Sequence, residues 1–144
     1  MIEEVSDYHF YIVGSLKDNN KEIYEKYSNL PQVTFVLNAP CLKQYYDKAK
    51  VFINPMFHGS GVKVKSVNAL INGLPLVSTT VGAEGIGLTH DMYFHADDIQ
   101  GFKNEILSVF NNQKLAIEKT LKAQEYLKRN NYLDVLKTEL NAFN

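Results

Sequence analysis

Cysteine is scarce in this sequence, and neither sign of charge is in excess. Cys41 is the single cysteine among 144 residues, so the chain cannot form an internal disulfide, which is typical of proteins from a reducing compartment. The 15 basic and 16 acidic side chains are spread along the chain and leave a formal net charge of −1. This balance predicts no nucleic-acid partner and no binding to an anionic membrane, so any phosphate site must be local.

Long apolar runs, repeats and linkers are also missing. No stretch approaches the roughly 18 apolar residues that a membrane span needs, and residues 1–7 lack the basic start and apolar run of a signal peptide. We therefore expect no membrane span in this segment and a cytoplasmic location, and membrane association through further parts of a longer chain stays open. Without repeats or linkers, residues 1–144 are expected to form one domain.

Motifs for metal binding or covalent catalysis are absent as well. One cysteine and four scattered histidines do not give the spacing of a metal site, and no serine-hydrolase, zinc-protease or P-loop motif occurs. We expect no metal and no cofactor. The sequence therefore assigns no catalytic residue.

What the sequence does contain is a regular alternation of short apolar runs and helical patterns. The runs are rich in β-branched and aromatic residues, as buried strands are, and occupy 8–13, 33–37, 51–53, 75–79 and 92–95. Helical patterns occupy 17–28, 40–48, 62–72, 114–129 and 132–142, and another helix, capped by Asp97 or Asp98, places Phe102, Ile106, Leu107 and Phe110 on one face. The alternation predicts an α/β fold with a doubly wound, mostly parallel sheet, whose ligands bind beyond the carboxyl ends of the strands.

The loop after the third strand carries the strongest local signal for a ligand. Gly59-Ser60-Gly61 stands directly before a helix, where glycines allow close approach and free N–H groups favour an anion such as phosphate. Lys63 and Lys65 follow in the first turn, where cations oppose the helix dipole. At about 100° per residue Lys63 projects beside the apolar face and Lys65 points away, so Lys63 is the predicted phosphate ligand. The alternative is that both lysines are solvated.

The loop after the fourth strand is expected to face the same cleft. The hydroxyl of Thr80, the backbone of Gly82 and the carboxylate of Glu84 could contact a sugar; the alternative is a glycine turn with Glu84 in solvent. His58 could donate a hydrogen bond to phosphate, and the remaining histidines are weaker candidates. The tyrosines are assigned to packing.

These signals occur in a recognisable order between residues 54 and 86. They are Gly59-Ser60-Gly61, then Val-Lys-Val-Lys, then a helix with small residues, then Gly73-Leu74-Pro75-Leu76-Val77-Ser78-Thr79, and then Val81-Gly82-Ala83-Glu84-Gly85. The order closely resembles the donor-binding, C-terminal domain of GT-B-fold glycosyltransferases of the "glycosyl transferases group 1" type. The resemblance extends more loosely from Phe10 to about Asn112.

The resemblance implies a nucleoside-diphosphate sugar as ligand, with its pyrophosphate on the backbone of Gly59 to Gly61 and on Lys63. It implies transfer of a hexose-type sugar to a glycan or lipid-linked acceptor in polysaccharide biosynthesis. Ser60 and Asn68 depart from the family, which often has a pair of glutamates at these two places, the second on the ribose hydroxyls. An uncharged Asn68 predicts weaker ribose binding.

The resemblance also implies that part of the enzyme is missing from this segment. The family's donor domain usually begins with another strand and helix, and an N-terminal acceptor-binding domain precedes it. The chain alone is therefore expected not to transfer sugar. The serious alternative is a non-catalytic binding module that keeps the glycosyltransferase shape.

Two other α/β classes fit the sequence poorly. A phospho-receiver domain would need an aspartate where Asn54 stands, after the third strand. A dinucleotide-binding oxidoreductase would need a glycine fingerprint after the first strand, where the chain has only Gly14-Ser15-Leu16-Lys17. Neither class is therefore expected.

Overall fold

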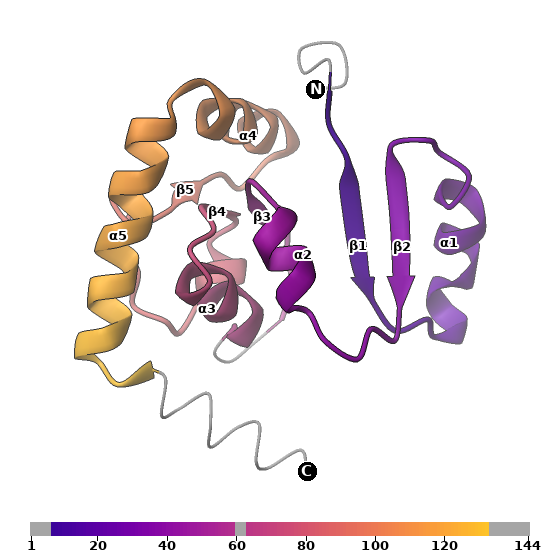
Figure 1. Cartoon of the computed structure of the whole chain (residues 1–144), viewed down its shortest axis with the longest axis horizontal. Coiled ribbons are helices and arrows are strands. Elements are labelled where there is room, and N and C mark those ends of the chain that lie inside the picture. Colours follow the sequence, from indigo (N-terminus) through magenta and orange to yellow (C-terminus); the bar gives the residue numbers. More distant parts are fainter. Residues whose placement is uncertain (1–6, 60–62, 133–144) are drawn as a thin grey trace. The chain divides into compact units, whose positions relative to one another are not determined.

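The computed structural model describes residues 7–59 and 63–132 (Figure 1). The chain divides into two compact units, residues 1–48 and residues 49–144. Each unit contains parallel strands and helices, which confirms the predicted α/β class.

The first unit is built on a parallel pair of strands. β1 (Phe10–Gly14) and β2 (Val33–Leu37) pair in register from Phe10↔Val33 to Gly14↔Leu37. The connection between them contains the 3-10 turn η1 (Asp18–Asn20) and helix α1 (Lys21–Tyr27), and helix α2 (Lys43–Lys48) follows β2. Parallel strands need such crossover connections, because a tight turn can join only antiparallel strands.

Aromatic contacts attach the two helices to this pair of strands. The Tyr24 ring of α1 packs edge-on against Phe35, with 5.2 Å between ring centroids, and the Tyr45 ring of α2 lies 5.7 Å from Tyr11. Even so, no described residue of this unit is buried. Two strands and two short helices leave their apolar side chains in contact with water.

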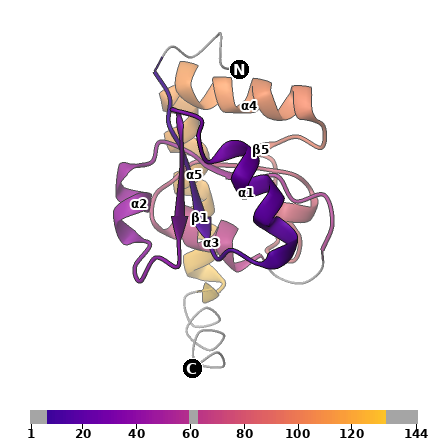
Figure 2. The same cartoon turned by 90° about the vertical axis from the view of Figure 1, so that its right-hand side faces the viewer.

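The second unit contains a three-stranded parallel sheet in the order β3-β4-β5. The strands are β3 (Phe52–Asn54), β4 (Leu76–Ser78) and β5 (Phe94–His95). Between and after them come α3 (Val64–Ile71), the 3-10 turn η2 (Val81–Ala83), α4 (Ile99–Asn111) and α5 (Gln113–Arg129). Figures 1 and 2 both show α4 across one end of α5, and α3 also contacts α5.

The core of the second unit joins α3, β4 and α5. Its buried members are Val67, Leu70, Leu76, Ala83, Ile86, Tyr93, Ala123 and Leu127. The Gln124 amide nitrogen of α5 also donates to the Leu70 backbone oxygen at 2.9 Å. The Leu70 oxygen also accepts from the Gly73 N–H at 3.0 Å, so this carbonyl at the end of α3 has one partner in the following turn and another in α5.

Most elements lie close to their predicted positions and Asp98 is one of the two predicted caps, while the strand pairing and the inward face of α4 differ from the prediction. The five strands form separate sheets of two and three strands. Asp98, whose side chain accepts from the Gly101 N–H at 2.7 Å, is the cap of α4. Val109 faces the interior on this helix, whereas Phe110, which the sequence placed on the apolar face, is exposed. A helix over 132–142 lies almost wholly outside the described residues, and the single domain over 1–144 stays a prediction.

Candidate functional site

The loops that follow β3, β4 and β5 meet at the carboxyl ends of these strands. A hollow of about 350 Å³ is lined by Met56 and Phe57 after β3, by Thr79, Thr80 and Val81 after β4, and by Asp97 after β5. Its volume is within the range of small-molecule sites. The sequence placed a ligand at this edge of the sheet, and the structure forms a concavity there.

Lys63 lies at the start of α3 with most of its side chain buried. Its relative exposure is 7%, and its Nζ lies 3.3 Å from the position that a Cβ on Gly59 would take. No carboxylate of a described residue forms an ion pair with it. Gly59 has φ +137, a backbone conformation that favours glycine. The structure thus brings Gly59 and Lys63 together.

Lys65, two residues further along α3, is exposed. This confirms the difference in burial that helical spacing predicted for the two lysines. Ser60 and Gly61, the other predicted phosphate ligands of this loop, lie outside the described residues. Asn68 is half-buried one turn after Val64, and His58 is exposed.

Gly82, in the loop after β4, is buried against β3 and β4. A Cβ at this position would lie 2.4 Å from Ser78 Oγ and 2.8 Å from the Asn54 backbone oxygen. Its N–H donates to Thr79 Oγ1 at 3.0 Å. Packing therefore explains why glycine is needed here, and a ligand contact by Gly82 stays a prediction. Glu84 follows η2 and is exposed.

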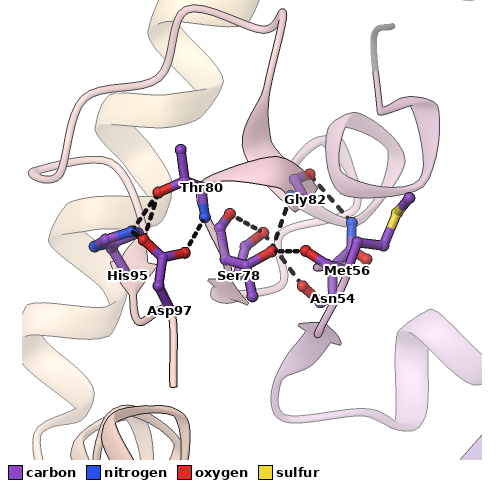
Figure 3. A network of polar contacts seen from close by, with 8 residues as sticks. Asn54, Met56, Ser78, Thr80, Gly82, His95 and Asp97 are labelled. Carbon is purple, nitrogen blue, oxygen red and sulfur yellow. Dashed lines mark hydrogen bonds and ion pairs between the residues drawn. The ribbon is translucent and has the colours of Figure 1, made fainter. Parts of the chain in front are cut away.

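Thr80 belongs to a polar cluster with His95 and Asp97, in which the three side chains turn toward one another (Figure 3). The Thr80 hydroxyl donates to Asp97 Oδ2 at 2.7 Å and lies 2.8 Å from His95 Nε2. The Thr80 backbone N–H donates to Asp97 Oδ1 at 2.7 Å. His95 Nε2 lies 3.0 Å from Asp97 Oδ2, and since a carboxylate only accepts, Nε2 carries the hydrogen.

These contacts also set the charge of the cluster. The Thr80 backbone N–H, followed by the Thr80 hydroxyl, lowers the pKa of the Asp97 carboxyl, and His95 lowers it further. The Asp97 side chain is nevertheless 54% exposed. Asp97 is thus an ionised, oriented acceptor at the rim of the hollow.

Sequence reasoning missed this cluster, although strand pairing explains it. Ser78 of β4 stands opposite His95 of β5 in the parallel register. Two residues further along each chain, Thr80 and Asp97 are again neighbours. The register of two short strands cannot be read from the sequence, which therefore predicts Asp97 only as a helix cap and His95 only as a weak candidate.

Two tyrosines hold the chain that follows Glu84. The Tyr126 hydroxyl of α5 donates to the Ile86 backbone oxygen at 3.0 Å, and the Tyr132 hydroxyl donates to the same oxygen at 2.5 Å. Gly87, at φ +88, leaves room for the Tyr126 hydroxyl, which would lie 2.1 Å from a Cβ there. The glycine-rich segment is therefore anchored to α5.

Within the described ranges 7–59 and 63–132, no group of three or more histidine, cysteine or acidic side chains is arranged to hold a metal ion. The helices of these same ranges include none with both the length and the apolar character that a membrane crossing requires.

Comparison with known proteins identifies the family that this chain matches. Residues 1–112 match the family described as "Glycosyl transferases group 1". Over 118 residues the chain is 31% identical to an uncharacterized 44.6 kDa protein in the cps region of Klebsiella pneumoniae. The match covers 78% of this chain and 30% of that relative, so the chain spans less than a third of the relative's length.

Two solved structures share the fold. The C-terminal domain of LpcC, a glycosyl transferase group 1 family protein from Francisella tularensis, matches with TM-score 0.73 and 11% identity over 89% of this chain and 72% of that domain. A mutant of TarM from S. aureus, in complex with Fondaparinux, alpha-GlcNAc-glycerol and UDP, matches with TM-score 0.73 and 20% identity over 99% of this chain and 30% of that protein. The fold and the matched residues agree with the resemblance in 54–86, and the chain belongs to the glycosyl transferases group 1 family of GT-B glycosyltransferases.

Proposed function

We propose that this chain binds the nucleoside-diphosphate sugar of a glycosyltransferase that transfers a hexose-type sugar to a glycan or lipid-linked acceptor. The observation that carries the proposal is Lys63, a cation that is 7% exposed and has no carboxylate partner among the described residues. A diphosphate would supply the missing negative charge.

The surroundings of Lys63 support an anion rather than a neutral ligand. The first turn of α3 contains no acidic residue, so the lysine and the positive end of the helix dipole act in the same direction. Both would attract phosphate oxygens. The S. aureus relative TarM has been solved with UDP, which supports a nucleoside diphosphate as the ligand class.

The sugar end of the donor would then lie toward the loop after β4. Thr80 and Asp97 line the hollow and offer a hydroxyl and a carboxylate to sugar hydroxyls. Glu84 is the exposed carboxylate of the same loop. Asn68, where the family often has glutamate, can accept only as an uncharged amide, so we expect modest affinity for the ribose.

The whole enzyme would need more than this segment. The chain spans 30% of the relatives' length, and we propose that the acceptor site and the general base belong to an N-terminal acceptor domain of the same protein. The chain alone would bind donor without transferring sugar. We further propose a role in polysaccharide biosynthesis on the cytoplasmic side of the cell.

A non-catalytic binding module is the second candidate. The observation that favours it is Asn68 in place of a carboxylate. The two candidates differ in the full-length protein, where only an enzyme would release nucleoside diphosphate from a nucleotide sugar in the presence of acceptor. Both predict binding of the nucleotide by this chain.

Titration calorimetry with UDP at fixed ionic strength tests the proposed binding. Lys63→Met removes the charge and keeps an apolar stem, and should remove a charge-assisted contact of about 1.5–3 kcal/mol, raising Kd about tenfold or more. Lys65→Met is the matched control on the exposed side of α3 and should cost well under about 1 kcal/mol. Equal losses for the two variants, or no binding of UDP, ADP or GDP by the wild-type chain, would contradict the proposal.

A further inference from the structure

Three buried residues connect the loop after β4 to the first turn of α3 through hydrogen bonds. They are Asn54 at the end of β3, Ser66 in α3 and Gly82 in η2, with exposures of 6% for Asn54 and 0% for Ser66. Gly82 is buried as well. The three residues come from separate segments of the second unit, so their contact joins these segments directly.

The hydrogen bonds among them have a defined direction. The Asn54 Nδ2 group donates to Ser66 Oγ at 2.8 Å and to the Gly82 backbone oxygen at 3.1 Å. The Ser66 hydroxyl, which accepts from Asn54, donates its own hydrogen to the same Gly82 oxygen at 2.8 Å. The Gly82 carbonyl can only accept, so the asparagine must present its NH₂ group to it. We call these three residues the Asn54–Ser66–Gly82 node.

Thr79 ties the same loop to the chain after β3 at a second point. Its hydroxyl donates to the Met56 backbone oxygen and accepts from the Gly82 N–H. Its own N–H lies 3.4 Å from the Asn54 backbone oxygen. Both backbone groups of Gly82 are therefore engaged, the N–H by Thr79 and the carbonyl by the node.

Ser66 is also bonded directly to the turn that carries Lys63. The Ser66 N–H donates to the Lys63 backbone oxygen at 3.0 Å. On the other side of the node, Gly82 lies between Thr80 and Glu84 in the chain. Through its backbone N–H and its side-chain hydroxyl, Ser66 thus connects the Lys63 backbone to the loop with the predicted sugar contacts.

We propose that Ser66 is a positioning residue, which fixes the 79–84 loop against the first turn of α3 so that Lys63 and that loop form one preorganised donor site. The inference rests on the proposed function, because it concerns how the nucleotide-sugar site is held. Alanine at position 66 would keep the Cβ but would remove one of the two donors to the Gly82 carbonyl. Binding would then have to order the loop, which lowers affinity.

The test compares two variants that each remove one buried hydroxyl, Ser66→Ala and Thr120→Val. Thr120 is 5% exposed and its hydroxyl donates to the Ala116 backbone oxygen within α5, so this control lies outside the loop. We measure amide hydrogen exchange of Gly82 and Ala83 relative to the β4 amides, and Kd for UDP, in the 144-residue chain. Dividing the exchange rates of Gly82 and Ala83 by those of the β4 amides cancels the effect of a general loss of stability.

Ser66→Ala should accelerate exchange at Gly82 and Ala83 about tenfold relative to β4 and raise Kd for UDP about three- to tenfold. Thr120→Val should leave both quantities within about twofold of wild type. Ser66→Cys, which keeps a weak donor, should fall between wild type and Ser66→Ala and takes its place if the alanine variant does not fold.

Each outcome decides the inference. Unchanged loop exchange in Ser66→Ala or Ser66→Cys overturns the role of the node. Accelerated exchange with wild-type Kd also overturns it, because the loop would then not contribute to the site. If the wild-type chain binds none of UDP, ADP and GDP, the proposed function is overturned, and the exchange ratio alone then decides whether Ser66 positions the loop.

Discussion

The two units of this chain are built from the same kinds of element, yet only one of them has a core. In the first unit β2 (Val33–Leu37) is partly buried along four residues and ends at Leu37, which is 38% exposed. In the second unit all three residues of β4 (Leu76–Ser78) are buried. Both strands are apolar in sequence, so their hydrophobicity does not explain the difference.

The number of neighbouring strands and covering helices explains the difference in burial better. β4 has a strand on each side and contacts both α3 and α4. Among the described residues β2 pairs with β1 alone, and the Tyr24 ring of α1 packs against its Phe35. Burial of a strand requires partners at both edges and on both faces. The comparison therefore predicts that equivalent substitutions have large effects in the second unit and small effects in the first.

The largest effect is expected for a leucine in each unit. Leu76→Ala removes a side chain that is fully buried in β4 and should lower the free energy of unfolding by about 2–5 kcal/mol. Leu37→Ala, at the exposed end of β2, should cost under about 1 kcal/mol. Urea unfolding followed by circular dichroism measures both. Similar losses would mean that the first unit has a core of its own.

A smaller effect is expected from adding one methyl group to a glycine. Gly82→Ala would place a Cβ against Ser78 and Asn54, and overpacking of this kind costs about 1–3 kcal/mol. Gly14→Ala in β1 meets nothing within 4 Å and should leave stability unchanged or raise it by up to about 1 kcal/mol. Thermal denaturation of the two variants separates these cases, and a destabilised Gly14→Ala would argue against the open first unit.

Removing one tyrosine hydroxyl should have a smaller effect again. Tyr126→Phe deletes a donor to the Ile86 backbone oxygen, which keeps the Tyr132 hydroxyl as partner, so we expect a loss of about 0.5–1.5 kcal/mol. Tyr27→Phe, on the 40% exposed ring of α1, should have almost no effect. Amide exchange at Gly87 should rise only in the Tyr126 variant.

The smallest effect on stability is expected when the pH is lowered. Because its hydrogen bonds lower the pKa of Asp97 in the folded chain, Asp97 adds stability above its unfolded pKa, and this is lost as pH falls from about 5 through the folded pKa. The side chain is 54% exposed, so the contribution should be well under about 1 kcal/mol. Asp97→Asn should flatten the dependence of Tm on pH in this interval. If Asp97→Asn leaves the fall of Tm at acid pH unchanged, other carboxylates cause that fall.

The sequence was most informative where one segment determines its own structure. Residues 33–37 form the predicted strand without a change in bounds, and helical spacing separated the buried Lys63 from the exposed Lys65. These results depend on local periodicity, which is written in consecutive residues. The α/β class followed from the same local patterns.

Features that join distant segments could not be predicted in this way. The Thr80–His95–Asp97 cluster depends on the register of β4 and β5, and the Asn54–Ser66–Gly82 node joins residues 12 to 28 positions apart. The division of five strands into two sheets depends on pairing rather than on the strands themselves. On α4, Val109 faces inward and Phe110 is exposed. The two apolar residues are adjacent, so the sequence alone did not indicate which of them faces the core.

Helix α5 shows that the segment matched by the family ends before the segment needed for folding. The family match ends at residue 112, but α5 begins at Gln113 and contributes the buried Ala116, Ala123 and Leu127. Its Gln124 also closes the end of α3 at the Leu70 carbonyl. Truncation of the gene after codon 112 would preserve every recognisable motif. It would nevertheless expose the face of α3 that packs against α5. Evolutionary exchange or engineered fusion of this segment should therefore place its boundary after Tyr132, whose hydroxyl also donates to the Ile86 backbone oxygen.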